Sequence, residues 1–274
     1  MSRRERNSWV IGLVLAAVTV ALASSGWVGL RHRTGPRSSR LVRVAAASDL
    51  RFALPEIIDA FRKHDPEIGV DVVFGSSGTL FAQICQDAPF DVFLSADMAL
   101  VKQVIDTGRG DPESAFVYGI GEIVLWLPKN SKLAGVELDT TVLHHPLVKK
   151  IAIANPQHAP YGRIAVDTLK KRDVYERIAD RLVYCENVVQ AAQVVEAGAA
   201  DLGIIALSLA LAPPLKDKGH FRVITAADGP RLEQGCVVLR QAADREAAAR
   251  FCRFLRSGPG IEILRRYGFR QSGG

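Results

Sequence analysis

Short apolar runs alternate with helical patterns along most of this 274-residue chain, and that alternation limits the possible folds more than any other feature. The run VDVVF at residues 70–74 is rich in β-branched residues and predicts a buried strand. Apolar residues recur at helical spacing before it, at 54–61, and a further helix is predicted after it, at 79–87. Strands and helices that alternate in this way favour an α/β fold with largely parallel sheets. The other predicted strands cover 41–47, 91–96, 121–127, 150–154, 201–207, 221–225 and 235–239, and the other predicted helices cover 162–172, 174–183, 188–198, 243–256 and 259–267.

The first 40 residues have the layout of an export signal. A basic head leads into an apolar run from Trp9 to about Ala23, and an A-x-A cleavage pattern stands at 21–23. The uncharged stretch from Trp9 to Leu30 is also long enough to span a bilayer, so an uncleaved anchor is the alternative. We therefore expect residues 1–40 to be a signal peptide, or an N-terminal anchor, followed by a linker. Both interpretations predict export from the cytoplasm.

The charge distribution argues against a nucleic-acid partner. The chain has 35 basic and 29 acidic residues, a formal net charge of +6. Residues 1–40 contain seven arginines and one glutamate, which is also +6, so the remaining 28 basic and 28 acidic residues cancel. A nucleic-acid binder would concentrate its basic surplus in the folded domain.

The chain has four cysteines, and none of them forms a C-x-x-C motif, so no zinc site is predicted. In an exported protein they can form disulfides, although the spacing does not determine the pairing. Buried free thiols are the alternative. The four are Cys85, Cys185, Cys236 and Cys252.

Four predicted strands end in short turns that lead directly into helices. A helix N-terminus leaves backbone N–H groups without partners and carries the positive end of the helix dipole, so it attracts anions. Glycine lets a ligand approach the backbone, and serine adds a hydroxyl. In open α/β sheets, ligands bind beyond the carboxyl ends of the strands, where these turns lie. The turns contain SDL at 48–50, GSSGT at 75–79, PYG at 160–162 and ENV at 186–188.

Each turn taken alone is also an ordinary helix N-cap. The chain has no G-x-S-x-G elbow, no GxxxxGK[ST] phosphate loop and no H-x-x-x-H pair. The four turns together therefore favour an anion-binding protein over an enzyme.

The turns belong to an ordered series of segments that resembles a known family. The series resembles the periplasmic molybdate-binding proteins of ABC-type importers, which have a type II periplasmic-binding fold. The resemblance covers about residues 41–270. The segments are AAASDL, GSSGTLFAQI, APFDVFLSAD, IANPQHAPYG, AADLGIIAL and SGPGIEILRRYGF.

The resemblance implies a two-lobed α/β protein with mixed, mostly parallel sheets and a two-strand hinge. Lobe I would be discontinuous, with residues 41–122 and 207–274, and lobe II would cover 123–206. The chain would cross between the lobes near Gly121–Leu127 and again near Ala206–Ser208. Such a protein is a periplasmic monomer and not an enzyme. It uses no cofactor, captures molybdate or tungstate between its lobes, and delivers the anion to the membrane subunits of an ABC permease.

The family's ligand positions carry over onto five residues. Ser48 and Ser77 match serines that donate a hydroxyl and a backbone N–H. Tyr161 and Val188 should each donate a backbone N–H. Asp49 matches an asparagine in one branch of the family, and we expect its backbone N–H to face the anion while its side chain turns away and caps the helix.

One departure leaves the ligand's identity open. Many members have a tyrosine whose hydroxyl reaches the ligand, and Ala206 occupies that place here. Another tetrahedral oxyanion, such as sulfate or phosphate, is therefore an alternative ligand. An exported α/β hydrolase with Ser48 or Ser77 as nucleophile is a further alternative, as is an anchored sensor domain. The hydrolase would need a histidine and an acid beside the serine.

Overall fold

The computed structural model describes residues 40–133, 135–224 and 231–271. The chain divides into two compact units, Met1–Arg37 and Ser38–Gly274, and the described residues belong to the second. The predicted signal peptide or anchor therefore lies outside the described residues. Within the described ranges, no helix has the length and apolar character needed to cross a membrane.

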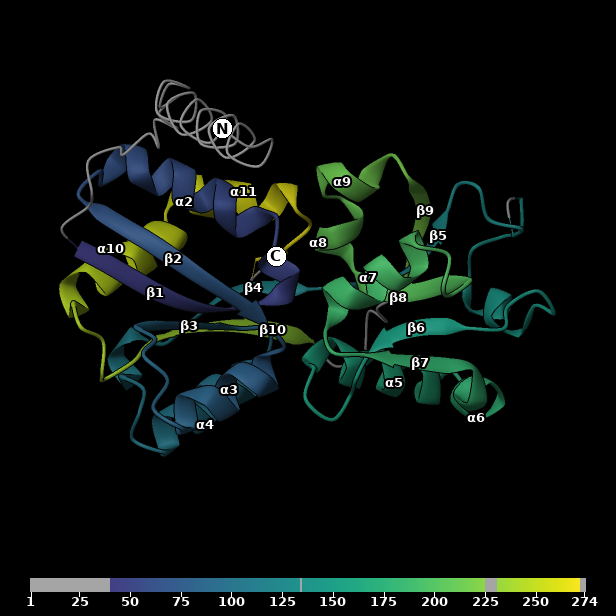
Figure 1. The fold of residues 1–274 in the computed structure, drawn as a ribbon, viewed down its shortest axis with the longest axis horizontal. Coiled ribbons are helices and arrows are strands. Elements are labelled where there is room, and N and C mark those ends of the chain that lie inside the picture. The colour runs from purple at the N-terminus through teal and green to yellow at the C-terminus, as the bar shows by residue number, and fades with distance from the viewer. Residues whose placement is uncertain (1–39, 134, 225–230, 272–274) are drawn as a thin grey trace, which may run out of the picture. The chain divides into compact units, whose positions relative to one another are not determined.

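The first of two five-stranded sheets has the strand order β2-β1-β3-β10-β4 (Figure 1). Strand β1 pairs in parallel with β2 and β3, whereas β10 is antiparallel to both of its neighbours. Four of the five strands therefore run in one direction. The bounds are β1 (Arg40–Ala47), β2 (Ile68–Gly75), β3 (Val92–Ser95), β4 (Phe116–Gly121) and β10 (Leu232–Val238).

Helices cover both faces of this sheet, which explains why its strands are apolar almost throughout. Helices α2, α10 and α11 lie on one face of the sheet, and α3 and α4 lie on the other (Figure 1). Val44 and Val92 belong to the apolar cluster on the first face, while Ala45 and Phe93 belong to the cluster on the second. This is the two-residue period of a strand. The helices are α2 (Ala53–His64), α3 (Ser77–Cys85), α4 (Met98–Asp106), α10 (Arg245–Leu255) and α11 (Gly258–Arg266).

The second sheet repeats the arrangement of the first, with the order β7-β6-β8-β5-β9. Strand β6 is parallel to β7 and β8, and β5 is antiparallel to β8 and β9. The strands are β5 (Ile123–Pro128), β6 (Ile151–Ala154), β7 (Leu182–Cys185), β8 (Leu202–Ala206) and β9 (Gly219–Val223). The helices are α5 (Pro160–Lys171), α6 (Tyr175–Ile178), α7 (Val188–Glu196), α8 (Leu207–Ala210) and α9 (Pro213–Lys216). Four short 3₁₀ helices are η1 (Ser48–Leu50), η2 (Pro112–Ser114), η3 (Thr140–His144) and η4 (Ala179–Arg181).

The two sheets define two lobes, and one lobe boundary differs from the expectation. Strand β4 of the first sheet ends at Gly121 and β5 of the second begins at Ile123, so the first crossing lies where it was expected. After Ala206, however, the chain forms α8, α9 and then β9, which pairs with β5. Residues 207–223 therefore belong with the second sheet, and the chain returns to the first between Val223 and Leu232.

The predicted helix at 174–183 is also wrong in its second half. Helix α6 ends at Ile178, and Leu182–Cys185 forms the edge strand β7. The spacing of the apolar residues in this segment fits both a helix and a strand. Residues 182–185 form a strand because they pair in parallel with β6.

Candidate oxyanion-binding site

The four strand-to-helix turns meet around one small cavity between the two lobes. All five predicted ligand residues line it, together with seven neighbours. The cavity is small, with about 10 Å³ open to the centre of a water-sized sphere, which is about the space that one water molecule needs. The lining residues are Ala47, Ser48, Asp49, Gly75, Ser76, Ser77, Ala96, Ala159, Pro160, Tyr161, Asn187 and Val188.

The turn before α3 places Ser77 on the wall of the cavity. The Ser76 hydroxyl caps the helix by accepting the Thr79 N–H at 3.3 Å, and the Gly78 N–H donates to the His158 carbonyl at 2.9 Å. The Ser77 hydroxyl oxygen accepts the Ala96 N–H at 2.9 Å. Its own proton is consequently left to donate to a ligand.

The first turns of α5 and α7 each leave one lining N–H near the cavity. At α7 the Asn187 side chain accepts the N–H groups of Val189 and Gln190, at 3.0 and 3.1 Å, so the Val188 N–H is not used by the cap. At α5 no side chain caps the helix, and the residue before Tyr161 is a proline that has no N–H. The N–H groups of Tyr161 and Val188 are thus the first-turn donors beside the cavity.

Asp49 takes part in a buried network that the sequence did not predict. Its Oδ2 accepts a hydrogen bond from the Tyr161 hydroxyl at 2.9 Å and another from Gln234 Nε2 at 2.7 Å. Gln234 Nε2 also donates to the Tyr161 hydroxyl at 3.0 Å, and the Tyr118 hydroxyl donates to Gln234 Oε1 at 2.7 Å. The Ser208 hydroxyl donates to the Asp49 carbonyl at 2.8 Å. Tyr161 and Ser208 belong to the second lobe, so this network joins the lobes.

The expectation that the Asp49 side chain caps a helix is wrong. Neither η1 nor α2 has a side-chain cap, because the carboxylate is engaged by Tyr161 and Gln234 instead. Burial raises the pKa of Asp49 to about 6, and the hydrogen bonds from Gln234 and Tyr161 oppose that rise, with smaller opposing contributions from the nearby backbone N–H groups of Asp49 and Leu50. Asp49 is 1% exposed, and its Oδ1 makes no hydrogen bond to the described residues.

Gln234, Tyr118 and Ser208 are the residues of this network that sequence reasoning missed. Gln234 is fully buried within the apolar strand LEQGCVV, and a polar residue at an inward position of such a strand is the signal that could have identified it. Ala206, by contrast, is buried at the end of β8 and is not among the lining residues.

A serine, a histidine and a glutamate also lie close together at the edge of the cavity. Ser76 Oγ is 3.0 Å from His158 Nδ1, and His158 Nε2 is 3.6 Å from Glu186. The serine is not Ser48 or Ser77, its hydroxyl is occupied as the cap of α3, and Glu186 accepts the Thr79 hydroxyl at 3.1 Å. We interpret the three residues as a contact between lobes. Among the described residues, no cluster of histidine, cysteine and acidic side chains suits a metal ion.

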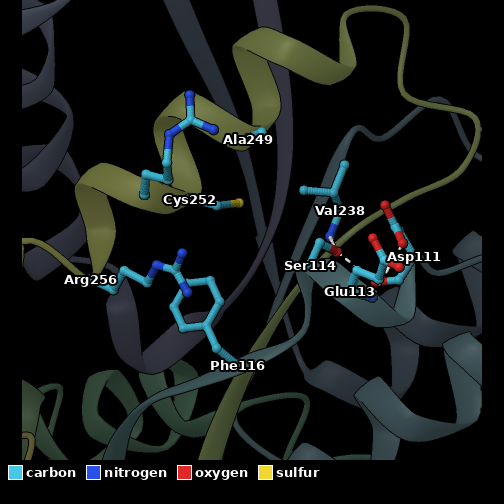
Figure 2. A pocket seen from close by; sticks show the side chains of 9 residues that line it. Asp111, Glu113, Ser114, Phe116, Val238, Ala249, Cys252 and Arg256 are labelled. Carbon is cyan, nitrogen blue, oxygen red and sulfur yellow. Dashed lines mark hydrogen bonds between the residues drawn. The ribbon is translucent and has the colours of Figure 1, made fainter.

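A second cavity, of about 230 Å³, lies in the first lobe between β10, η2 and α10 (Figure 2). Two of its four charged lining side chains, Asp111 and Arg253, form ion pairs. Arg245 pairs with Asp111, Arg253 pairs with Glu246, and Arg256 lies over the Phe116 ring. None of the four turns contributes to it.

Comparison with known proteins identifies the family of this chain. Residues 42–270 match the family model described as bacterial extracellular solute-binding protein. The chain belongs to this family. It is therefore a solute-binding protein that acts outside the cytoplasm, and it is not an enzyme.

Two relatives and two solved structures illustrate the similarity. The chain is 32% identical to the molybdate-binding protein ModA of Rhodobacter capsulatus over 254 residues, 85% of this chain and 97% of the relative. It is also 32% identical to ModA of Azotobacter vinelandii, over 83% of this chain and 89% of that one. The periplasmic molybdate-binding protein of A. vinelandii superposes with a TM-score of 0.78 at 29% identity, over 84% of this chain and 99% of that structure. The sulfate-binding protein SubI of Mycobacterium tuberculosis, at 14% identity and a TM-score of 0.71 over 85% and 88% of the two chains, shares the fold alone. The predicted α/β periplasmic-binding fold and the family resemblance are confirmed.

Proposed function

We propose that this solute-binding protein captures molybdate between its lobes and delivers it to an ABC permease. The observation that carries the proposal is the cavity itself, which is small and is lined by the first turns of helices from both lobes. The molybdate-binding relatives support the choice of ligand. Molybdate is the cargo in this proposal and not a cofactor.

Ser48, Asp49, Ser77, Tyr161 and Val188 are the proposed ligand residues. The hydroxyls of the two serines and the backbone N–H groups of all five would replace the hydration shell of the anion. Hydrogen bonds to charged groups contribute roughly 1.5–3 kcal/mol each, so five to seven of them can support tight binding after desolvation. No lysine or arginine lines the cavity, so selection rests on the number and direction of neutral donors.

Contacts across the cavity mouth would hold the loaded form closed. His158 contacts Ser76 and Gly78, while Arg163 of α5 pairs with Asp97 at the start of α4. Opening of these contacts at the permease would release the anion. We expect the protein to act as a periplasmic monomer and to bind tungstate as well, because the site would recognise the shape and charge of the anion.

Calorimetric titration of the purified full-length protein with molybdate, tungstate, sulfate and phosphate tests the proposal. Tight one-to-one binding of molybdate and tungstate, with no heat from the other two, is the expected result. If sulfate or phosphate binds and molybdate does not, the assignment of the fold stands, but the assignment of molybdate as the ligand is wrong. Absence of binding by all four anions would contradict the proposal.

A further inference from the structure

Asp49 presents a chemical conflict at the proposed anion site. The residue lines the cavity, yet its side chain is a carboxylate. A negatively charged carboxylate would repel a dianion bound beside it. The side chain has no room to swing out to solvent, because it is 1% exposed and held by Tyr161 and Gln234.

The groups that surround Asp49 offer no positive charge to offset the repulsion. Tyr161 of α5 and Tyr118 of β4 are the titratable groups that act on it, and burial raises the pKa of both phenols well above 10, so both stay neutral. Gln234 of β10, Ser208 of α8 and Val188 of α7 are uncharged. The largest contributions to the pKa of Asp49 come from burial, Gln234, Tyr161 and the local backbone, and none of these carries a positive charge.

The two carboxylate oxygens differ in a way that accommodates a proton. Oδ2 already accepts hydrogen bonds from Tyr161 and Gln234, whereas Oδ1 has no hydrogen-bond partner among the described residues. A proton on Oδ1 would therefore leave the network with Tyr161 and Gln234 intact. It would also remove the negative charge from the wall of the cavity.

We propose that Asp49 takes up a proton on Oδ1 when the oxyanion binds, so that the protein binds one dianion and one proton together. The inference rests on the proposed function and adds a specificity-determining residue to it. The proton comes from solvent. It joins the Asp49 carboxylate as the dianion binds, so the bound state contains a neutral carboxyl beside the dianion. Burial already brings the pKa of Asp49 to about 6 without ligand, and an adjacent dianion raises it further, so that the carboxyl stays protonated in the bound state across the pH range of the measurement.

Molybdate titrations near pH 7.5, in buffers of different ionisation enthalpy, measure the number of protons taken up. We expect close to one proton for the wild type and close to none for Asp49→Asn, which keeps the shape of a neutral carboxyl. The wild-type Kd should rise by up to tenfold for each pH unit between pH 6.5 and 8.5, while the Kd of Asp49→Asn should change little. Thermal unfolding of both proteins without ligand checks that the variant is folded.

Two results would overturn the inference. One is tight molybdate binding by the wild type without proton uptake, and the other is equal uptake by the wild type and Asp49→Asn. In both cases the proposed function stands, because molybdate still binds. If Asp49→Asn does not fold, the wild-type proton number alone decides the question. If the wild type binds no oxyanion at all, the proposed function fails first and the inference fails with it.

A second and independent observation concerns two cysteines in the first lobe. Cys236 of β10 and Cys252 of α10 are both buried, and their Sγ atoms are 3.4 Å apart. The sulfurs need to approach by only about 1.4 Å to reach the length of a disulfide bond. Cys252 also lines the 230 Å³ cavity, together with Val238 and Ala249 (Figure 2).

The geometry points to a Cys236–Cys252 disulfide in the protein outside the cytoplasm, where disulfides persist. Its formation is a thiol–disulfide exchange. An oxidised dithiol protein or small disulfide is reduced to two thiols, and the two cysteines lose two protons and two electrons as the S–S bond forms. Cys85 and Cys185 have no such neighbour among the described residues and stay free thiols.

Alkylation of the protein from the extracytoplasmic fraction, under denaturing conditions without reductant, tests this assignment by mass spectrometry. We expect two alkylated cysteines, Cys85 and Cys185, and a linked peptide pair that separates on reduction. The Cys252→Ser variant should show three alkylated cysteines and is the control for complete labelling. Four alkylated cysteines in the wild type would overturn the assignment.

Discussion

The side chains around the cavity divide into groups that would face the ligand and groups that hold those in place. Ser77 belongs to the first kind, because its oxygen accepts the Ala96 N–H and its proton is free to donate. Gln234 and Tyr118 belong to the second kind, because their hydrogen bonds are satisfied within the protein. Asp49 has both roles, with one oxygen in the network and one without a partner.

Replacement of Ser77 by alanine should weaken molybdate binding without unfolding the protein. The variant loses one hydroxyl donor to a charged ligand, which is worth roughly 1.5–3 kcal/mol, so Kd should rise by about 10- to 150-fold. Calorimetric titration measures the change. Ser257→Ala, at the start of α11 and outside the cavity, is the matched control and should leave Kd unchanged. An unchanged Kd for Ser77→Ala would reject the role of this serine.

The buried Asp49 carboxyl should give ligand-free stability a characteristic pH dependence. Folding raises its pKa from 3.8 to about 6, so it stabilises the fold below pH 4 and loses that contribution as the pH rises through 6. A shift of two units corresponds to roughly 3 kcal/mol as an upper figure. Urea unfolding of the wild type and of Asp49→Asn from pH 4 to 8 measures the contribution of this carboxyl, because the two proteins have all other titratable groups in common. The wild type should lose free energy of unfolding relative to the variant between pH 4 and 6, and parallel profiles would contradict this.

Among the helices and strands, the first turns of α3, α5 and α7 matter most to the site. They are brought together because parallel strands deliver their carboxyl ends to one edge of each sheet. The two edges then approach closely, as the hydrogen bond from Gly78 to the His158 carbonyl shows. A Cβ atom at Gly78 would lie within 3.0 Å of backbone atoms of His158, so this approach requires glycine.

Gly78→Ala should therefore hinder closure of the lobes. The added methyl group would push α3 away from residue 158, separate the Ser77 donor from those of the second lobe, and raise the Kd for molybdate by about tenfold or more. Gly258→Ala, in the first turn of α11, is the matched control, because a Cβ there meets no atom within 4 Å. Titration of both variants checks the prediction. Equal Kd values for the two variants would contradict the prediction and show that the backbone at residue 158 can move to make room for the methyl group.

The whole molecule consists of two sheets with the same order of parallel and antiparallel strands, and the ligand residues come from both. The first lobe supplies Ser48, Asp49 and Ser77, and the second supplies Tyr161 and Val188. A ligand that contacts both lobes binds only when they are closed and folded. Ligand binding should therefore increase the free energy of unfolding of both lobes together.

Thermal unfolding should consequently depend on molybdate concentration. At a ligand concentration of 100 times Kd, linkage adds about 2.7 kcal/mol, which corresponds to an increase in Tm of roughly 5–10 °C for a protein of this size. The increase should continue as molybdate is raised further, and it should be much smaller for Ser77→Ala at the same concentration. Calorimetric scans with and without molybdate measure it. A Tm that does not respond to molybdate would argue against a site shared by the two lobes.

Much of this protein could be read from local patterns in its sequence. Apolar periodicity is a local property, so strands such as β1 and helices such as α2 were predicted close to their observed bounds. The polar turns at the strand ends were visible for the same reason, and the five ligand candidates found in them line one cavity. Helices α4, α8 and α9 and strand β4 were missed, and β7 was taken for part of a helix.

The contacts that span the chain could not be found in this way. Asp49 meets Tyr161 across 112 positions of sequence and Gln234 across 185, and no short pattern encodes either contact. Strand β9 likewise joined the second sheet only through its pairing with β5. Local side-chain chemistry selects helix, strand and turn, whereas the burial of a carboxylate, the partner of a strand and the meeting of two lobes depend on how distant segments pack together.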